Sequence, residues 1–88
     1  MSLQKHVIIG VHITDRIQHV DPVQQLLTET GCSIKTRLGL HDADENFCSP
    51  NGLLLLEMIG DDATHDDMIG KLNNIEGVEA QKMVFDHP

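Results

Sequence analysis

The longest apolar run in the chain is Gly52-Leu-Leu-Leu-Leu-Glu-Met-Ile-Gly60, which is bracketed by glycines. The run does not alternate between apolar and polar residues, so it has no obvious wet face. It is also far shorter than the about 20 apolar residues that a membrane-spanning helix needs. Such a run is typical of a strand that is buried on both faces, near the centre of a sheet. We therefore expect residues 52–60 to form a central strand.

Three further segments alternate with the period of a strand. In residues 5–13 one face carries Val7, Ile9, Val11 and Ile13, and the other carries His6, Ile8, Gly10 and His12. In residues 33–41 the dry face carries Ile34, Thr36, Leu38 and Leu40, and the polar face carries Ser33, Lys35, Arg37, Gly39 and His41. Residues 78–85 form the last predicted strand.

Helical spacing appears twice between these strands. Asp21-Pro22 resembles a helix start, with Asp as the N-cap and Pro at the first helical position. Ile17 and Val20 extend the same apolar stripe backwards, so a start at Asp15 with Pro22 inside the helix is the alternative. We favour the start near Asp21.

The second helix is predicted to begin with Thr64 as its N-cap. Its apolar stripe is Met68, Ile69, Leu72 and Ile75, and Gly77 ends it. His65 would then lie near the start of the helix, where a cation is unfavourable, and we expect it to be neutral and exposed.

The predicted element order is β-α-β-β-α-β, which is the ferredoxin-like, ACT-like arrangement of the α+β class. Right-handed crossovers place the first and third strands in the middle of a four-stranded antiparallel sheet, with both helices on one face. We expect residues 3–86 to form a single domain with this fold.

The other face of this sheet has no predicted cover. We expect it to carry the ligand-binding or interface residues, which we predict as His12, Arg37, Gly39, Leu54 and Leu56. An open apolar face normally marks a protein interface. The sequence therefore predicts a homodimer or larger oligomer that forms through the sheet.

Composition narrows the classes of function. The net charge is −8, with 14 acidic and 6 basic residues, so the chain lacks the cations that neutralise nucleic-acid phosphates. Two cysteines are too few for a disulfide-stapled secreted scaffold, and we find no secretory leader. We expect a cytoplasmic protein that binds neither nucleic acid nor membranes.

Several short stretches resemble one family of small proteins. They are Arg37-Leu38-Gly39, Ile69-Gly70-Lys71-Leu72 and Ile75-Glu76-Gly77-Val78, with the apolar strand that ends Ile59-Gly60. These residues resemble the stand-alone ACT-like proteins known as iron-only hydrogenase system regulators, over about Val7 to Phe85. The resemblance implies a ferredoxin-like dimer or oligomer with a regulatory role and no defined catalytic site.

A more distant resemblance is to the metal-binding domain of the nickel-responsive repressor. That domain places two alternating histidines at the end of its second strand and a cysteine shortly after. Here His41 and Cys48 fall near two of those positions, whereas Gly39 stands where the other histidine would be. Imidazole and thiolate suit transition metals, so His41 and Cys48 are the candidate ligands of a metal site.

The sequence contains no nucleophile elbow, phosphate-binding loop or dinucleotide fingerprint. We therefore expect a non-enzymatic regulatory or ligand-sensing module with an unidentified effector. A transition-metal sensor that uses His41 and Cys48 is one alternative, and a small dimeric ferredoxin-like enzyme is the other.

Overall fold

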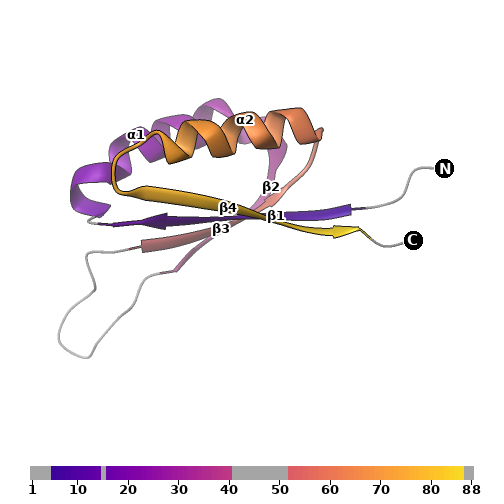
Figure 1. Ribbon diagram of the computed structural model, residues 1–88, viewed down its shortest axis with the longest axis horizontal. Helices are drawn as coiled ribbons and strands as arrows, with labels where there is room; N and C mark the ends of the chain where they lie inside the picture. Colours follow the sequence, from indigo (N-terminus) through magenta and orange to yellow (C-terminus); the bar gives the residue numbers. More distant parts are fainter. Residues whose placement is uncertain (1–4, 15, 41–51, 87–88) are drawn as a thin grey trace.

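The computed structural model describes residues 5–14, 16–40 and 52–86. Its elements in chain order are β1 (Lys5–Ile13), α1 (Arg16–Glu29), a short 3₁₀ turn at Gly31–Ser33, β2 (Ile34–Leu40), β3 (Gly52–Met58), α2 (Asp62–Asn73) and β4 (Val78–Asp86). The strands form one antiparallel sheet in the order β2-β3-β1-β4. Both helices cover the same face of the sheet (Figure 1). The predicted α+β ferredoxin-like fold is confirmed.

The core lies between the helices and the two central strands. Alternate residues of β1 point into it, and Ile9 and Val11 are fully buried. From the helices, Val23, Met68 and Leu72 close the same cluster. The apolar run is central as predicted, because β3 lies between β2 and β1.

The first helix begins earlier than the favoured prediction. It starts at Arg16, and Pro22 lies inside it, so the start near Asp21 is wrong and the longer alternative is right. Proline removes one backbone donor from a helix but does not forbid it. The apolar stripe that continues back from Val23 to Val20 and Ile17 in the sequence favours this longer helix.

The second helix is capped by Asp61 and not by Thr64. The Asp61 backbone is extended, and its carboxylate accepts a hydrogen bond of 2.9 Å from the backbone N–H of Thr64. This is the usual N-cap geometry, in which the cap bonds to the third residue of the helix. Thr64 is therefore the donor in the cap.

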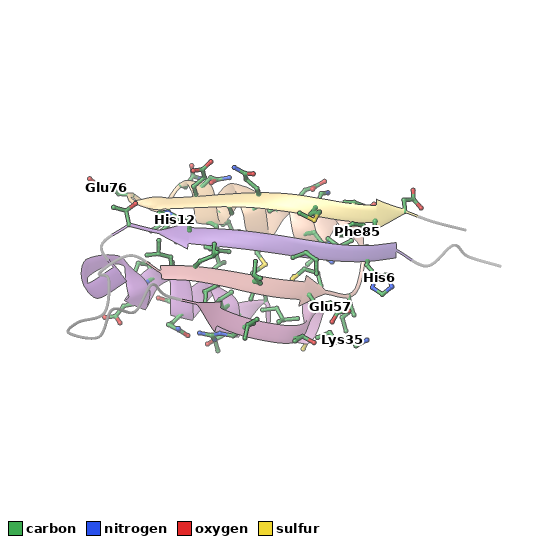
Figure 2. The ribbon with its side chains drawn as sticks, turned by 90° about the horizontal axis from the view of Figure 1, so that it is seen from below. His6, His12, Lys35, Glu57, Glu76 and Phe85 are labelled. Carbon is green, nitrogen blue, oxygen red and sulfur yellow. The ribbon has the colours of Figure 1, made fainter. Side chains whose placement is uncertain are left out.

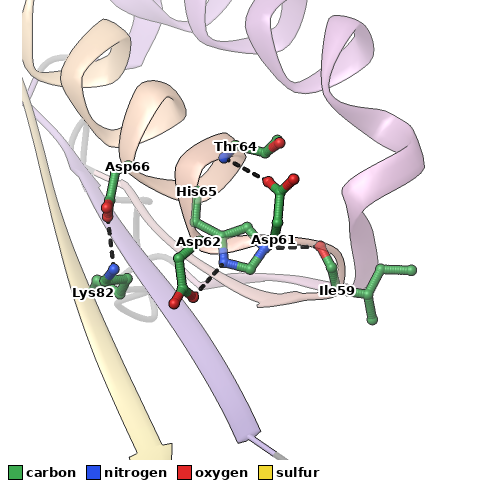
Figure 3. Close-up of polar contacts among 7 residues, drawn as sticks. All are labelled: Ile59, Asp61, Asp62, Thr64, His65, Asp66 and Lys82. Atoms are coloured by element: carbon green, nitrogen blue, oxygen red, sulfur yellow. Dashed lines mark hydrogen bonds and ion pairs between the residues drawn. The ribbon is translucent and has the colours of Figure 1, made fainter. Parts of the chain in front are cut away.

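Side-chain contacts hold α2 against the edge strand β4. Asn73 donates to the Ala80 carbonyl at 3.2 Å and accepts from its N–H at 2.8 Å. Lys82 Nζ lies 2.6 Å from Asp66 Oδ1 (Figure 3). The strand is thus held to the helix by the two hydrogen bonds of the Asn73 amide and by the ion pair between Lys82 and Asp66.

A β-bulge in β2 changes which face its residues occupy. The pairing of β2 with β3 shifts between Ile34 and Thr36, so Ile34 lies opposite Met58 while Thr36 lies opposite Glu57. An extra residue in a strand reverses the alternation beyond it. Arg37 and Gly39 therefore fall on the helix side, and their predicted position on the open face is wrong.

Two predicted open-face leucines of β3 also belong to the helix side. Leu56 lies opposite Ile9 and is completely buried. Leu54 lies opposite Val11 and packs partly buried against the same core. Their predicted place on the open face is wrong, because residues paired across antiparallel strands share a face. The open face instead carries Leu53, Leu55 and Glu57.

No helix in the described ranges has both the length and the apolar character needed to cross a membrane.

Candidate functional site

The face of the sheet opposite the helices is the candidate functional site, and we call it the open face. It carries the residues that alternate with the core residues of each strand. By strand they are Thr36 and Leu38 of β2; Leu53, Leu55 and Glu57 of β3; His6, Ile8, Gly10 and His12 of β1; and Glu79, Gln81, Met83 and Phe85 of β4. Figure 2 shows the molecule from this side.

An apolar band crosses the open face diagonally. The band consists of Leu38, Leu53, Leu55, Ile8, Met83 and Phe85. Leu38 is 51% exposed, Met83 is 56% exposed and Phe85 is 49% exposed. Large apolar side chains that gather on one face in this way mark an interaction surface.

A polar cluster lies beside the band at the end of the face where β2 begins, and we call it the Glu57 corner. One Glu57 oxygen accepts a hydrogen bond of 3.0 Å from the Thr36 hydroxyl. The other lies 3.9 Å from Lys35 Nζ and 3.8 Å from His6 Nδ1. Figure 2 shows Lys35, Glu57 and His6 together at this end of the sheet. A carboxylate is thus held among donors from the two neighbouring strands.

A second polar cluster lies at the opposite end of the face, around a shallow hollow that we call the Gly10 hollow. Its volume is about 230 Å³, and its lining residues are Gly10, His12, Leu53, Glu79 and Gln81. The Gln81 amide donates to the Glu79 carboxylate at 2.9 Å. A Cβ atom at position 10 would have only one neighbour within 4 Å, Leu55 Cδ2 at 3.9 Å. The space above Gly10 is therefore open, and a larger side chain at this position would extend into it. The hollow exists because position 10 is glycine.

The predicted site residues are only partly brought together. His12 lies on the open face at the Gly10 hollow, whereas Arg37, Gly39, Leu54 and Leu56 lie on the helix side. His41 and Cys48 are outside the described residues, so the metal site remains a prediction. Within the described ranges, no group of three His, Cys, Asp or Glu side chains could hold a metal ion.

One buried polar residue was missed by sequence reasoning. His65 is 1% exposed, so its predicted exposure is wrong. Its Nε2 lies 2.8 Å from the carbonyl oxygen of Ile59, which can only accept, so Nε2 carries the proton (Figure 3). No described atom is within hydrogen-bond distance of Nδ1, and the nearest carboxylate oxygen, on Asp62, is 4.0 Å away. His65 therefore joins the end of β3 to the first turn of α2.

Two exposed groups on the helix side have shifted pKa values. Hydrogen bonding from Thr64, through its side chain and then its backbone, lowers the pKa of Asp61. The hydrogen bond to Asp66 raises the pKa of Lys82. Both shifts favour the charged forms of the two side chains. The partners, Thr64 and Asp66, are residues of α2, so these contacts stabilise that helix and take no part in the open face.

The fold resembles several solved structures. An uncharacterized protein from Thermotoga maritima superposes with a TM-score of 0.78 at 23% identity, over 93% of this chain and 99% of the other. CPII from Thiomonas intermedia K12, a nitrogen regulatory PII-like protein bound to ADP, AMP and bicarbonate, gives a TM-score of 0.57 at 10% identity, over 99% of both chains. A dimeric ferredoxin-like protein from an uncultured marine organism gives 0.51 at 10% identity, over 94% of both.

Sequence comparisons do not extend this picture. No protein-family model matches the chain, and no curated protein matches it. At these identities the structural likeness establishes the ferredoxin-like fold.

Proposed function

We propose that this protein is a non-enzymatic, ligand-sensing regulatory module that works as a homodimer or higher homo-oligomer through its open face. The observation that carries the proposal is the apolar band, which exposes Leu38, Met83 and Phe85 on a face that no described element covers. Covering these side chains with a second sheet would remove their apolar surface from water, which stabilises an assembly by about 25 cal/mol for each Å² that is buried. A domain of 88 residues has only a small core of its own. A second apolar core shared between two copies would therefore add a large fraction to the stability of each copy.

Two structural neighbours support the two halves of this proposal. The protein from the uncultured marine organism is a dimer with a ferredoxin-like fold, and CPII is a regulatory protein with bound small molecules. The regulatory step would be a population shift, in which an effector favours the subunit arrangement that it binds more tightly. Control of a hydrogenase system, which the sequence resemblance implies, is one specific form of this role.

The assembly is tested by sedimentation equilibrium of the wild type and of Leu38→Glu. The wild type should be oligomeric at micromolar concentration. The new carboxylate would be buried without a partner in the apolar band, so we expect the dissociation constant to rise at least about thirtyfold. Gln25→Glu is the matched control, because it adds the same charge on an exposed position of α1 and should leave assembly unchanged. A wild type that sediments as a stable monomer would contradict the proposal.

The sensing half is tested with the three molecules that CPII binds. ADP, AMP and bicarbonate are each titrated into the wild type at millimolar concentration, and thermal unfolding and sedimentation are followed. A ligand that binds the folded protein raises its unfolding temperature, and one that prefers one arrangement also changes the dissociation constant. Unchanged unfolding and assembly with all three would remove CPII-like sensing from the proposal.

A further inference from the structure

The open face has a pattern that restricts how two copies can pack. The Glu57 corner and the Gly10 hollow lie at opposite corners, and the apolar band runs between them. When two copies pack sheet against sheet with two-fold symmetry, the symmetry axis lies in the plane between the two sheets. Viewed perpendicular to the sheets, each residue then faces the partner residue whose position is its own reflected across that axis. The axis can run along the strands, across them or along either diagonal of the face.

Two of these directions place unlike groups together. An axis along the strands sets Leu38 opposite the partner's Gln81 and Thr36 opposite the partner's Met83. An axis across the strands sets Glu79 opposite the partner's Phe85. Such arrangements bury polar groups without partners, which is costly.

The two diagonals differ in how they pair the charges. The diagonal through the two polar corners sets Glu57 opposite the partner's Glu57, and Glu79 near the partner's Glu79, so like charges meet. The diagonal along the apolar band brings Leu53 to the partner's Leu38. It also brings the Glu57 corner of each copy to the Gly10 hollow of the other.

Strand dimensions place individual residues in this last arrangement. Strands lie about 4.8 Å apart, and residues along a strand lie about 3.4 Å apart. With an axis at about 45° to the strands, Gly10 lies opposite the partner's Glu57, and Glu79 lies beside the partner's Lys35. The strands of the two sheets then cross at about 90°, which is one of the two usual angles of sheet packing.

We propose that two copies of this chain pack open face to open face with their strands nearly perpendicular, so that Glu57 of each copy enters the Gly10 hollow of the other. This inference rests on the proposed assembly through the open face. The Glu57 carboxylate meets the side chains of His12 and Gln81 in a hollow that Glu79 also lines. The Lys35 ammonium enters with Glu57 and meets the Glu79 carboxylate, so a cation lies between the two carboxylates. Glu57 keeps its hydrogen bond from Thr36, so it enters the interface with a donor already bound.

A charge exchange tests the pairing of Lys35 with Glu79. Lys35→Glu and Glu79→Lys are made singly and together, and dissociation constants are measured by sedimentation equilibrium. Each single change sets like charges face to face and should raise the constant at least about tenfold, and the double change should recover most of the loss. A double variant no tighter than the weaker single variant would overturn the arrangement.

A second pair of variants tests the hollow itself. Gly10→Leu fills the hollow and should weaken the dimer at least about tenfold. Gly10→Ala should stay within about threefold of the wild type, because its Cβ meets Leu55 at an ordinary contact distance of 3.9 Å. Circular dichroism establishes that both variants are folded. A Gly10→Leu protein that dimerises like the wild type would overturn the arrangement and leave the hollow to another occupant.

The outcomes also separate this arrangement from the proposed assembly. If Leu38→Glu dissociates the wild-type oligomer while the charge exchange shows no recovery, the face is the interface and the perpendicular packing is wrong. If the wild type is a monomer, both the assembly and the packing are wrong.

Discussion

The two faces of the sheet are both rich in apolar residues, but only one of them is covered. On the helix side, Ile9, Val11 and Leu56 are fully buried. On the open side, Leu38 and Phe85 are about half exposed, and polar residues occupy the two corners. The helix side is organised to fill a core, whereas the open side combines apolar area with charges at defined positions. That combination is typical of a surface that selects a partner.

The largest expected effect comes from comparing two neighbouring leucines of β3. Leu56→Ala removes a fully buried side chain and should lower the free energy of unfolding by about 2–5 kcal/mol. Leu55→Ala changes the same residue type on the open face, where Leu55 is only partly buried, and should cost about 1 kcal/mol or less in the monomer.

Urea unfolding at a protein concentration below the dissociation constant of the oligomer measures both effects without the contribution of assembly. Equal losses for the two leucine variants would mean that the faces do not differ as described.

A slightly smaller effect is expected at the junction between β3 and α2. His65→Ala deletes a buried ring and leaves the Ile59 carbonyl without its donor, so the free energy of unfolding should fall by about 2–4 kcal/mol. His65→Gln retains an N–H donor and should lose less. The comparison is made by urea unfolding at pH 7, and a Gln variant as unstable as the Ala variant would indicate that volume and not the hydrogen bond matters.

The smallest effect concerns the cap of α2. The pKa of Asp61 is lowered in the folded protein, so the stability from its ionised form is fully present above the ordinary value of 3.8. That contribution is lost as pH falls through the lower pKa of the folded state. Asp61→Asn keeps a side-chain acceptor for Thr64 but does not titrate.

Thermal unfolding from pH 2 to pH 6 checks this expectation. The Asn variant should lose less stability than the wild type on acidification, although only by a few degrees because the group is exposed. Parallel acid profiles for the two proteins would contradict it.

The fold was predictable because its strands carry clear local signals. The period-2 alternation of β1 gave both its ends and its two faces correctly, and the apolar β3 was correctly placed in the centre of the sheet. The face of β2 was not predictable by the same rule. Its residues alternate cleanly in the sequence, but the bulge between Ile34 and Thr36 reverses the pattern, and a bulge has no marker in the local sequence here.

The candidate site was predicted at the level of a surface, and only His12 was placed on it correctly. Leu54 and Leu56 were misplaced because an all-apolar strand does not reveal which alternate residues face the helices. The pairing of Leu56 with Ile9 decides this, and pairing is a tertiary property. His65 was missed because its acceptor is a backbone carbonyl, which no side-chain pattern records.

The ion pair between Lys82 and Asp66 has a consequence for unwanted association. β4 is an edge strand, and its outer backbone groups could pair with a strand of another chain and start aggregation. Lys82 places a charge on the helix side in the middle of this edge, and Arg37 does the same on the other edge strand, β2, beside its bulge. A strand added at the β4 edge would have to approach the ion pair of Lys82 with Asp66, and a strand added at the β2 edge would have to approach the Arg37 guanidinium. Charged residues on edge strands are a common protection against such pairing, so we expect both edges to be poorer routes for association than the broad face.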